Sequence, residues 1–245
     1  FVPPIRQGLT AIDRHHVERA VEGSLQRLGV DYIDLYQVHW PDTVLPIVES
    51  MEALDRLVQA GKVRYVGTSN ENAYGLTKAN TVCEYEGLAK FQSIQNNFSL
   101  INPRFLDELA NVCRKEQVSL LPYSPIGGGV LSGKYNGDEV PRNTRFGDYL
   151  HDDNPRQKAM ADRFVNDATI AATAKYLDIA RQAEMSPVTL ATAWSMNFDF
   201  VASTIIGART AEQLEAPLAA LDIKLSDEVM QQCAAVQKEI LYPMG

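Results

Sequence analysis

The sequence predicts an α/β protein with parallel strands. Short β-branched or aromatic segments alternate with amphipathic helical segments along the chain, about five segments read as strands, and no hairpin signal joins any two of them. Such alternation is typical of parallel strands joined by right-handed crossovers. An open doubly wound sheet and a closed (β/α) barrel both fit this pattern.

The first part of the chain contains three helix–strand pairs. The expected helices are residues 13–28, 47–60 and 72–86, and the expected strands are 32–38, 63–69 and 91–95. Apolar residues recur every three to four positions in the helices, which indicates one buried face. Asp13 is expected to cap the first helix, and Gly29 and Gly61 are expected to end the first two.

The second part continues the alternation around one long irregular segment. Helices are expected at 103–116, 164–184, 187–197, 211–221 and 227–238, and strands at 119–123 and 202–206. Ser186 and Pro187 read as the cap and first-turn proline of a helix. The segment 124–162, rich in Gly, Pro, Asn and Asp, is longer than ordinary connections, which predicts a functional or disordered loop.

Five strands are too few for a closed barrel, which needs eight. The chain also begins with Phe1 rather than Met. We therefore expect one partial barrel domain over residues 1–245, with about the first three β/α units missing from this chain.

Composition excludes several function classes. Lys and Arg number 23 against 31 Asp and Glu, which gives a net charge of −8 and no basic cluster for nucleic acid. Three scattered cysteines predict a reduced, cytoplasmic setting without disulfides. No apolar run approaches the roughly 18 residues that a membrane helix needs. Neither a nucleic-acid nor a membrane partner is expected, and the oligomeric state is not readable.

Polar or glycine-rich residues follow every expected strand. His39 follows the first strand, Ser69 and Asn70 follow the second, and Gln95 ends the third. Chemistry in parallel α/β proteins gathers at these carboxyl ends. His39 alone is equally compatible with a catalyst and a structural hydrogen-bonding residue. No residues around it have metal-ligand spacing, so no metal is expected.

Two further segments have features of phosphate sites. Glycines at 127–129 followed by Lys134 allow close approach of backbone amides to an anion. The segment 207–210, with Arg209, precedes an expected helix, where free N–H groups favour phosphate. The alternatives are a mobile loop for the first segment and a capped turn with a surface arginine for the second.

The segments 21–39, 61–70, 123–134 and 206–214 together resemble the aldo-keto reductase family in order and spacing. Details around residues 40–42 and in the long loop are similar to the Tas-like and potassium-channel β-subunit side of that family. The resemblance covers essentially the whole chain. It implies a (β/α)8 TIM barrel of the aldo-keto reductase type and an NADP-dependent oxidoreductase that reduces aldehydes or ketones.

The resemblance also assigns roles to individual residues. His39 would be catalytic and orient the carbonyl of a small-molecule substrate. The residues expected to bind NADP(H) are Ser69, Asn70 and Gln95 at the carboxamide, Tyr123 under the nicotinamide ring, Ser124, Pro125, Ile126, Gly127, Gly128, Lys134 and Arg145 at the pyrophosphate, and Gly207, Arg209 and Gln213 at the 2′-phosphate.

Two departures from the family pattern stand out. The family's catalytic tyrosine, lysine and aspartate belong to its first three strands, so they are expected upstream of Phe1, and this chain alone is expected to be inactive. Tyr36 does not replace the tyrosine, because strand alternation points it away from the face of His39. Ala216 and Pro217 stand where the family commonly has Glu-Asn against the adenine.

Two other functions stay open at this point. One is a cofactor-binding regulatory or interaction subunit with little or no turnover. The other is an unrelated (β/α) enzyme that shares only the fold, although this leaves the collinear motifs unexplained.

Overall fold

The computed structural model describes residues 12–42, 44–137 and 139–244. Within it the chain forms two compact units. The first contains residues 1–96 and 108–121, and the second contains residues 97–107 and 122–245. The expectation of a single domain over residues 1–245 stays a prediction.

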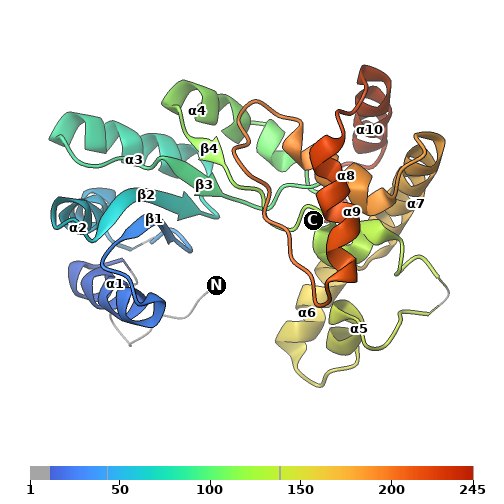
Figure 1. Ribbon diagram of the computed structural model, residues 1–245, viewed down its shortest axis with the longest axis horizontal. Helices are drawn as coiled ribbons and strands as arrows, with labels where there is room; N and C mark the ends of the chain where they lie inside the picture. The colour runs from blue at the N-terminus through green and yellow to red at the C-terminus, as the bar shows by residue number, and fades with distance from the viewer. Residues whose placement is uncertain (1–11, 43, 138, 245) are drawn as a thin grey trace. The chain divides into compact units, whose positions relative to one another are not determined.

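The first unit is built on a parallel sheet of four strands (Figure 1). They are β1 (Ile33–Val38), β2 (Val63–Ser69), β3 (Ser93–Gln95) and β4 (Ser119–Leu120). Strand order follows chain order, and every neighbouring pair is parallel. The predicted parallel α/β class is confirmed, and these strands lack the reversal of order that defines a doubly wound sheet.

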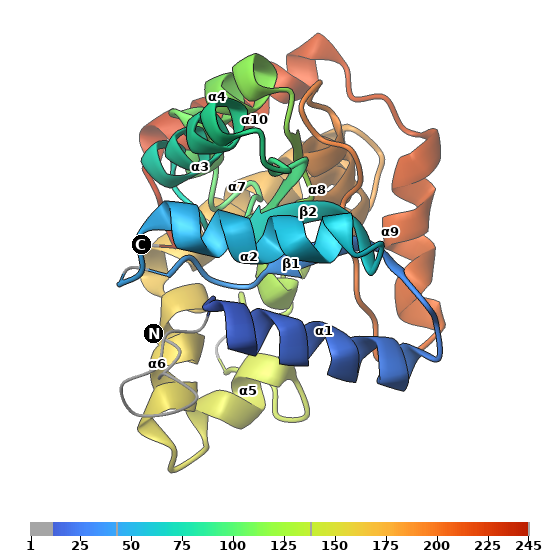
Figure 2. The same ribbon diagram turned by 90° about the vertical axis from the view of Figure 1, so that its left-hand side faces the viewer.

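Four helices accompany this sheet: α1 (Arg14–Leu28), α2 (Ile47–Gln59), α3 (Ala73–Glu86) and α4 (Leu109–Glu116). The predicted start and stop of α1 are confirmed, because the Asp13 carboxylate accepts the His16 N–H and Gly29 adopts φ +67°. Figure 2 shows α1 and α2 in front of the sheet. The Tyr36 hydroxyl lies beside Ser24 of α1, so alternate residues such as Gln37 face the side of the sheet away from α1.

The second unit is mainly helical. Its elements are η1 (Arg104–Leu106), η2 (Gly127–Ser132), α5 (Arg145–Leu150), α6 (Pro155–Phe164), α7 (Asp167–Gln182), α8 (Pro187–Met196), η3 (Glu212–Leu214), α9 (Glu215–Ala219), η4 (Ala220–Asp222) and α10 (Asp227–Glu239), where η marks a 3-10 helix. Phe98 lies at the centre of its aromatic core, with ring centroids 4.7 Å from Trp194 and 5.2 Å from Phe198. Ser186 caps α8 as predicted.

The expected helix over 103–116 is wrong as a single element. Arg104–Leu106 forms a 3-10 turn in the second unit, and α4 begins only at Leu109 in the first. Glu108 between them has φ −138°, which no helix accommodates.

The long segment 124–162 is not irregular throughout. It contains η2, α5 and most of α6. Thr144 caps α5, and Asn154 followed by Pro155 opens α6. The expected helix over 164–184 likewise divides, because Asn166 caps α7 with a reciprocal capping box.

The expected strand over 202–206 is not a strand of the structure. The Ile205 N–H donates to the Pro122 carbonyl at 2.8 Å, next to β4 in sequence. Proline has no N–H to return a second bond, so a ladder cannot propagate from this position. The expected helix over 211–221 is confirmed, because η3, α9 and η4 follow one another directly over residues 212–222. Pro217 lies inside α9, where its missing N–H leaves one helical hydrogen bond unmade.

Candidate functional site

The first unit brings four predicted site residues together at the carboxyl ends of its strands. The Ser69 hydroxyl donates to the Gln95 carbonyl at 2.6 Å, and the Asn70 amide N–H donates to the same carbonyl at 3.1 Å. The Asn70 side chain donates to the His39 carbonyl at 2.9 Å and to Ser69 Oγ at 3.1 Å. One asparagine therefore joins the ends of β1, β2 and β3.

Strand register explains why these residues meet. Ser69 pairs with Gln95, and Val38 pairs with Thr68, so His39 comes level with Ser69 one residue beyond β1. His39 lies two positions after Gln37, which faces away from α1, and odd-numbered residues along β1 share that face. The sheet itself therefore places the three strand ends side by side.

A polar layer that the sequence did not single out lies directly beneath. Gln37 pairs with Gly67, and Gly67 pairs with Ser93. The Gln37 side-chain amide donates to Ser93 Oγ at 3.2 Å across β2. A Cβ at Gly67 would overlap Ser93 Oγ, so only glycine lets this bond cross the middle strand. A glycine two residues before Ser69, in a strand, was the available signal.

His39 is the exposed member of the strand-end group. Its ring centroid lies 6.2 Å from that of Trp40 at a tilt of 44°. Its main chain is fixed by Asn70, whereas no hydrogen bond to its imidazole occurs among the described residues. An imidazole held at a strand end in this way can donate a hydrogen bond to a ligand oxygen.

Tyr36 cannot take part in chemistry beside His39. Its hydroxyl lies beside Ser24 of α1, on the helix side of the sheet, and its burial there raises the pKa of the phenol. The expectation that Tyr36 does not replace the family's catalytic tyrosine agrees with this placement.

In the second unit, the predicted pyrophosphate loop winds through a series of left-handed residues. Ser124, Gly127, Gly128 and Gly129 have φ values of +56°, +56°, +63° and +99°. The Gly127 amide donates to the Ser124 carbonyl, and the Gly129 amide donates to the Ile126 carbonyl, both at 2.9 Å. These two amides are therefore already bonded within the loop.

Gly128 makes room for an aromatic cluster under the loop. A Cβ at this position would lie 2.6 Å from ring atoms of Phe146. Phe146 in turn stacks on Phe164 at 4.9 Å and lies 5.9 Å from the Tyr135 ring. Tyr123, which starts the loop, is half-buried, and this burial raises the pKa of its hydroxyl.

Two predicted cations lie beside this loop. A Cβ at Gly129 would lie 2.7 Å from Lys134 Nζ, so the absence of a side chain at Gly129 leaves room for the Lys134 ammonium group. The Arg145 guanidinium lies 5.5 Å from the Phe146 ring centroid, at the start of α5. Both side chains are exposed, and neither forms an ion pair with another described residue.

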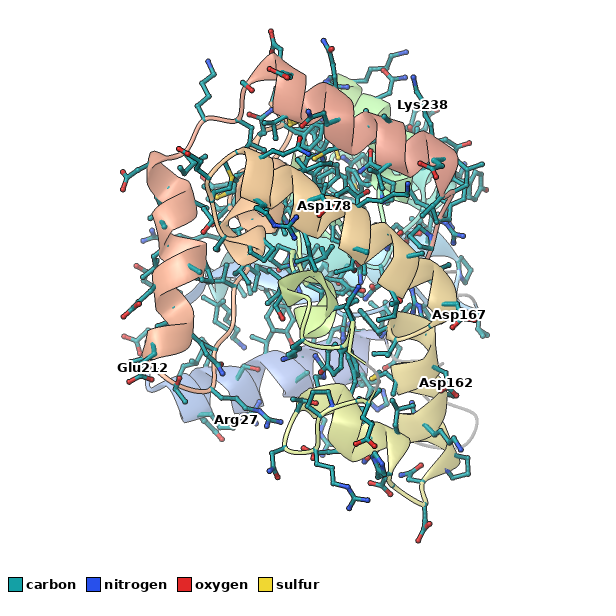
Figure 3. The ribbon with its side chains drawn as sticks, turned by 90° about the vertical axis from the view of Figure 1, so that its right-hand side faces the viewer. Arg27, Asp162, Asp167, Asp178, Glu212 and Lys238 are labelled. Carbon is teal, nitrogen blue, oxygen red and sulfur yellow. The ribbon has the colours of Figure 1, made fainter. Side chains whose placement is uncertain are left out.

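The third predicted cluster is an exposed turn before η3. The Arg209 amide donates to the Gln213 side-chain oxygen at 2.9 Å, so these two residues are brought together. Nothing lies within 4 Å of a Cβ built at Gly207. The Glu212 carboxylate, labelled in Figure 3, accepts hydrogen bonds from its own backbone and from Thr210, which lower its pKa.

Ala216 and Pro217 give this turn no polar side chain for an adenine. Thr189 Oγ1 of α8 donates to the Ala216 carbonyl at 2.9 Å, and Pro217 is buried. The main chain at Ala216 is therefore bonded to α8 rather than open to a ligand.

Other kinds of site find little support. Among residues 12–42, 44–137 and 139–244, no three His, Cys, Asp or Glu side chains gather as metal ligands would. None of the described helices is long and apolar enough to cross a membrane. All three cysteines are buried thiols, and burial raises the pKa of Cys83 to about 11.

Comparisons with known proteins match the motifs. The sequence profile of the Aldo/keto reductase family matches residues 5–238. Protein Tas of Escherichia coli K12 is 35% identical over 253 residues, covering 95% of this chain and 70% of Tas. An NADH-specific methylglyoxal reductase of the same organism is 30% identical over 225 residues, covering 91% of this chain and 64% of its own.

A putative aryl-alcohol dehydrogenase of Schizosaccharomyces pombe is 33% identical over 220 residues, which cover 89% of this chain and 58% of the relative. Because the family profile covers most of the chain, the expectation that three β/α units are missing is not supported. The predicted relationship itself is confirmed: the chain belongs to the aldo/keto reductase family.

Proposed function

We propose that this protein is a carbonyl reductase that uses NADP(H), built on the (β/α)8 barrel of its family. The observation that carries the proposal is the strand-end group, in which Asn70 ties Ser69, Gln95 and the exposed His39 into one hydrogen-bonded edge. Carbonyl reduction needs an oriented hydrogen-bond donor at the substrate oxygen beside a bound hydride source.

The residues of the first unit fit the nicotinamide end of such a cofactor. When bound, the cofactor supplies the hydride that reduces the carbonyl carbon. The Gln95 side chain is half-buried at the strand end and offers both an amide donor and an acceptor for a carboxamide. Ser69 is only 3% exposed and its hydroxyl donates to the Gln95 carbonyl, so it supports the strand ends beneath the cofactor rather than contacting the cofactor directly.

His39 acts on the substrate in this proposal. Its imidazole would donate a hydrogen bond to the carbonyl oxygen and stabilise the negative charge that develops there. The proton that completes the alcohol would come from a tyrosine, as the family resemblance implies. The bond from Asn70 to the His39 carbonyl holds this residue at the end of β1. The substrate class is a small aldehyde or ketone.

The residues of the second unit fit the phosphate groups by charge. Lys134 and Arg145 are exposed cations beside the glycine loop. The amides of Gly127 and Gly129 already donate hydrogen bonds to carbonyls within the loop. We therefore assign pyrophosphate binding mainly to these side chains. Arg209 beside Gln213 is the proposed contact of the 2′-phosphate, which favours NADPH over NADH.

Titration of the protein with NADPH and with NADH, followed by cofactor fluorescence, tests the cofactor. We expect NADPH to bind about tenfold or more tightly than NADH, the worth of one charge-assisted contact. Arg209→Gln should remove this preference. Failure to bind either nucleotide would reject the proposal, whereas tighter binding of NADH would reject only the assignment of the 2′-phosphate.

Oxidation of NADPH by the full-length protein in the presence of simple aldehydes tests the reaction, because the chain of residues 1–245 alone is expected to be inactive. His39→Ala should lower kcat/KM by about 100-fold while leaving cofactor affinity within twofold, because an oxyanion donor acts mainly in the transition state. His15→Ala, an exposed histidine of α1, is the matched control and should change neither. Tight cofactor binding without any turnover would instead support a regulatory, cofactor-binding subunit.

A further inference from the structure

A buried carboxylate follows the Ser69–Asn70 turn, and the mechanism above does not use it. We propose that Glu71 is a positioning residue, which braces this turn from behind so that the strand-end group keeps the geometry that binds the cofactor. This inference rests on the proposed function and adds a residue to it.

The turn needs support because Asn70 adopts φ +57°. Asparagine visits the left-handed region more readily than other residues with a side chain, and it stays there where surrounding bonds fix it. Bonds from Asn70 to the Gln95 and His39 carbonyls fix it from the front. Both bonds end on Gln95 and His39, the residues that the cofactor and substrate are proposed to contact.

Glu71 holds the turn from the other side at two points. Its main-chain carbonyl accepts a hydrogen bond from the Asn96 side chain at 2.9 Å, which ties it to the residue after β3. Its carboxylate accepts the Asn72 N–H at 2.8 Å, next to the first turn of α3. Glu71 itself is only 8% exposed, and both of its hydrogen bonds are partly buried.

Gly75 makes this arrangement possible. A Cβ at Gly75 would overlap both the Cδ and the Oε1 atoms of Glu71. Alanine suits a helix better than glycine by roughly 0.5–1 kcal/mol, so a glycine in the first turn of α3 has a steric reason. The glycine and the carboxylate form one unit.

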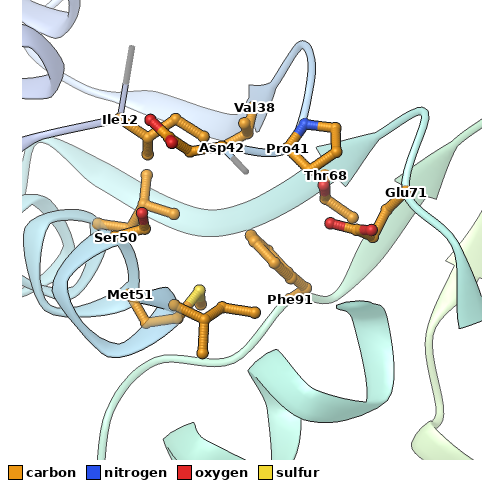
Figure 4. Close-up of a pocket in the computed structure, with 11 residues that line it drawn as sticks. Ile12, Val38, Pro41, Asp42, Ser50, Met51, Thr68, Glu71 and Phe91 are labelled. Atoms are coloured by element: carbon orange, nitrogen blue, oxygen red, sulfur yellow. The ribbon is translucent and has the colours of Figure 1, made fainter. Parts of the chain in front are cut away.

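The environment shows that the carboxylate is not there for packing alone. Figure 4 shows Glu71 with Thr68 and Phe91 on a small cavity of about 30 Å³ between the sheet and α2. Burial raises the pKa of Glu71, so its charged form is disfavoured there, and the hydrogen bond from the Asn72 N–H opposes this shift. An apolar side chain would fill this space without that cost.

Three variants separate positioning from folding. Glu71→Ala removes the brace, Glu71→Gln keeps its shape and one acceptor for the Asn72 N–H, and Gly75→Ala displaces the carboxylate. Gly23→Ala in α1 is the matched control, because a Cβ there meets only the flexible end of Arg27 at 3.1 Å. Each variant is measured for thermal stability, for NADP(H) affinity, and for hydrogen exchange of the Asn70 amide without cofactor.

We expect Glu71→Ala and Gly75→Ala each to weaken NADP(H) binding about tenfold and to speed exchange of the Asn70 amide, which is the scale of one lost buried hydrogen bond. Glu71→Gln should stay within about threefold of the natural protein. The double variant should bind no more weakly than Glu71→Ala, because the two changes remove one interaction. Gly23→Ala should bind as the natural protein does.

Natural affinity and natural Asn70 exchange in Glu71→Ala would overturn the inference. Equal losses in Glu71→Gln and Glu71→Ala, tracking the loss of thermal stability, would also overturn it, since a merely structural residue behaves that way. If Glu71→Ala does not fold, Gly75→Ala and Glu71→Gln decide. If the natural protein binds no pyridine nucleotide, the proposed function fails, and the exchange measurements still decide whether Glu71 braces the turn.

Discussion

The predicted site residues form a strand-end half in the first unit and a loop half in the second, and the two are held in place differently. In the first unit, side chains at the ends of three strands are locked by hydrogen bonds of 2.6–3.1 Å. In the second, exposed cations lie over a loop whose left-handed glycines and aromatic cluster set its shape. One half achieves its geometry through strand register, and the other through glycine conformation and charge. The two halves should therefore respond differently to substitution and to salt.

The loop half should be the more fragile to added volume. Gly128→Ala combines a left-handed residue with a Cβ 2.6 Å from the Phe146 ring, so we expect a loss of about 2–4 kcal/mol in the free energy of unfolding. Gly207→Ala, in open space, should change it by less than about 0.5 kcal/mol. Urea unfolding measures both. Equal effects would show that the loop is not held by this contact.

Salt should distinguish the two halves. Lys134→Ala and Arg145→Ala should each weaken NADP(H) binding about tenfold at low ionic strength, and the loss should shrink as salt screens the charges. Gln95→Ala should weaken binding about threefold regardless of salt, because it removes a neutral contact.

Lys224→Ala, an exposed lysine of the second unit, is the control for the salt series. A salt-independent loss in Lys134→Ala would contradict the assignment of the loop cations to the phosphates. Titrations at several salt concentrations supply the comparison.

The strand-end half should be sensitive to the conformation of one residue. Asn70→Gly loses two side-chain hydrogen bonds but tolerates φ +57°, whereas Asn70→Ala also bears the cost of a left-handed backbone. We expect Asn70→Ala to be about 1 kcal/mol less stable than Asn70→Gly. Chemical denaturation of the pair tests this, and equal stability would mean that the turn relaxes.

The smallest expected effect is a pH dependence from Glu71. Burial raises the pKa of Glu71 in the folded state above its ordinary value of 4.5. At a pH between the unfolded-state and folded-state pKa values, the folded state therefore binds more protons than the unfolded state. The stability contributed by protonation is complete below pH 4.5 and is lost as pH rises through the folded-state pKa. Glu71→Gln should lack this decline in a series of melts, and parallel curves for both proteins would contradict the burial argument.

Local signals predicted much of the fold. Asp13, Gly29 and Ser186 end or begin helices where the sequence indicated, because caps depend on a few adjacent residues. Thr144 and Asn154-Pro155 carried the same signals inside the long loop, but the loop's composition concealed two short helices. Pro122 shows the reverse, since it has no N–H to donate and the strand that periodicity favours at 202–206 does not form beside it.

The strand-end residues of the site were predictable because they follow strands. The residues that hold them were not, because each acts across the fold. Gln37 reaches Ser93 only through register over Gly67, and Asn96 reaches Glu71 from the end of another strand. Sequence periodicity carries no information on such pairings, which depend on which strands become neighbours.

The parallel sheet has a consequence for how the protein folds. Ile33 pairs with Val63 and Ser93 with Ser119, so each strand finds its partner 26 to 30 residues away, beyond an intervening helix. No ladder can start as a local hairpin, and contacts of this range are slow to form. The strand-end group joins residues of three strands, so we expect it to form only once all three strands have paired.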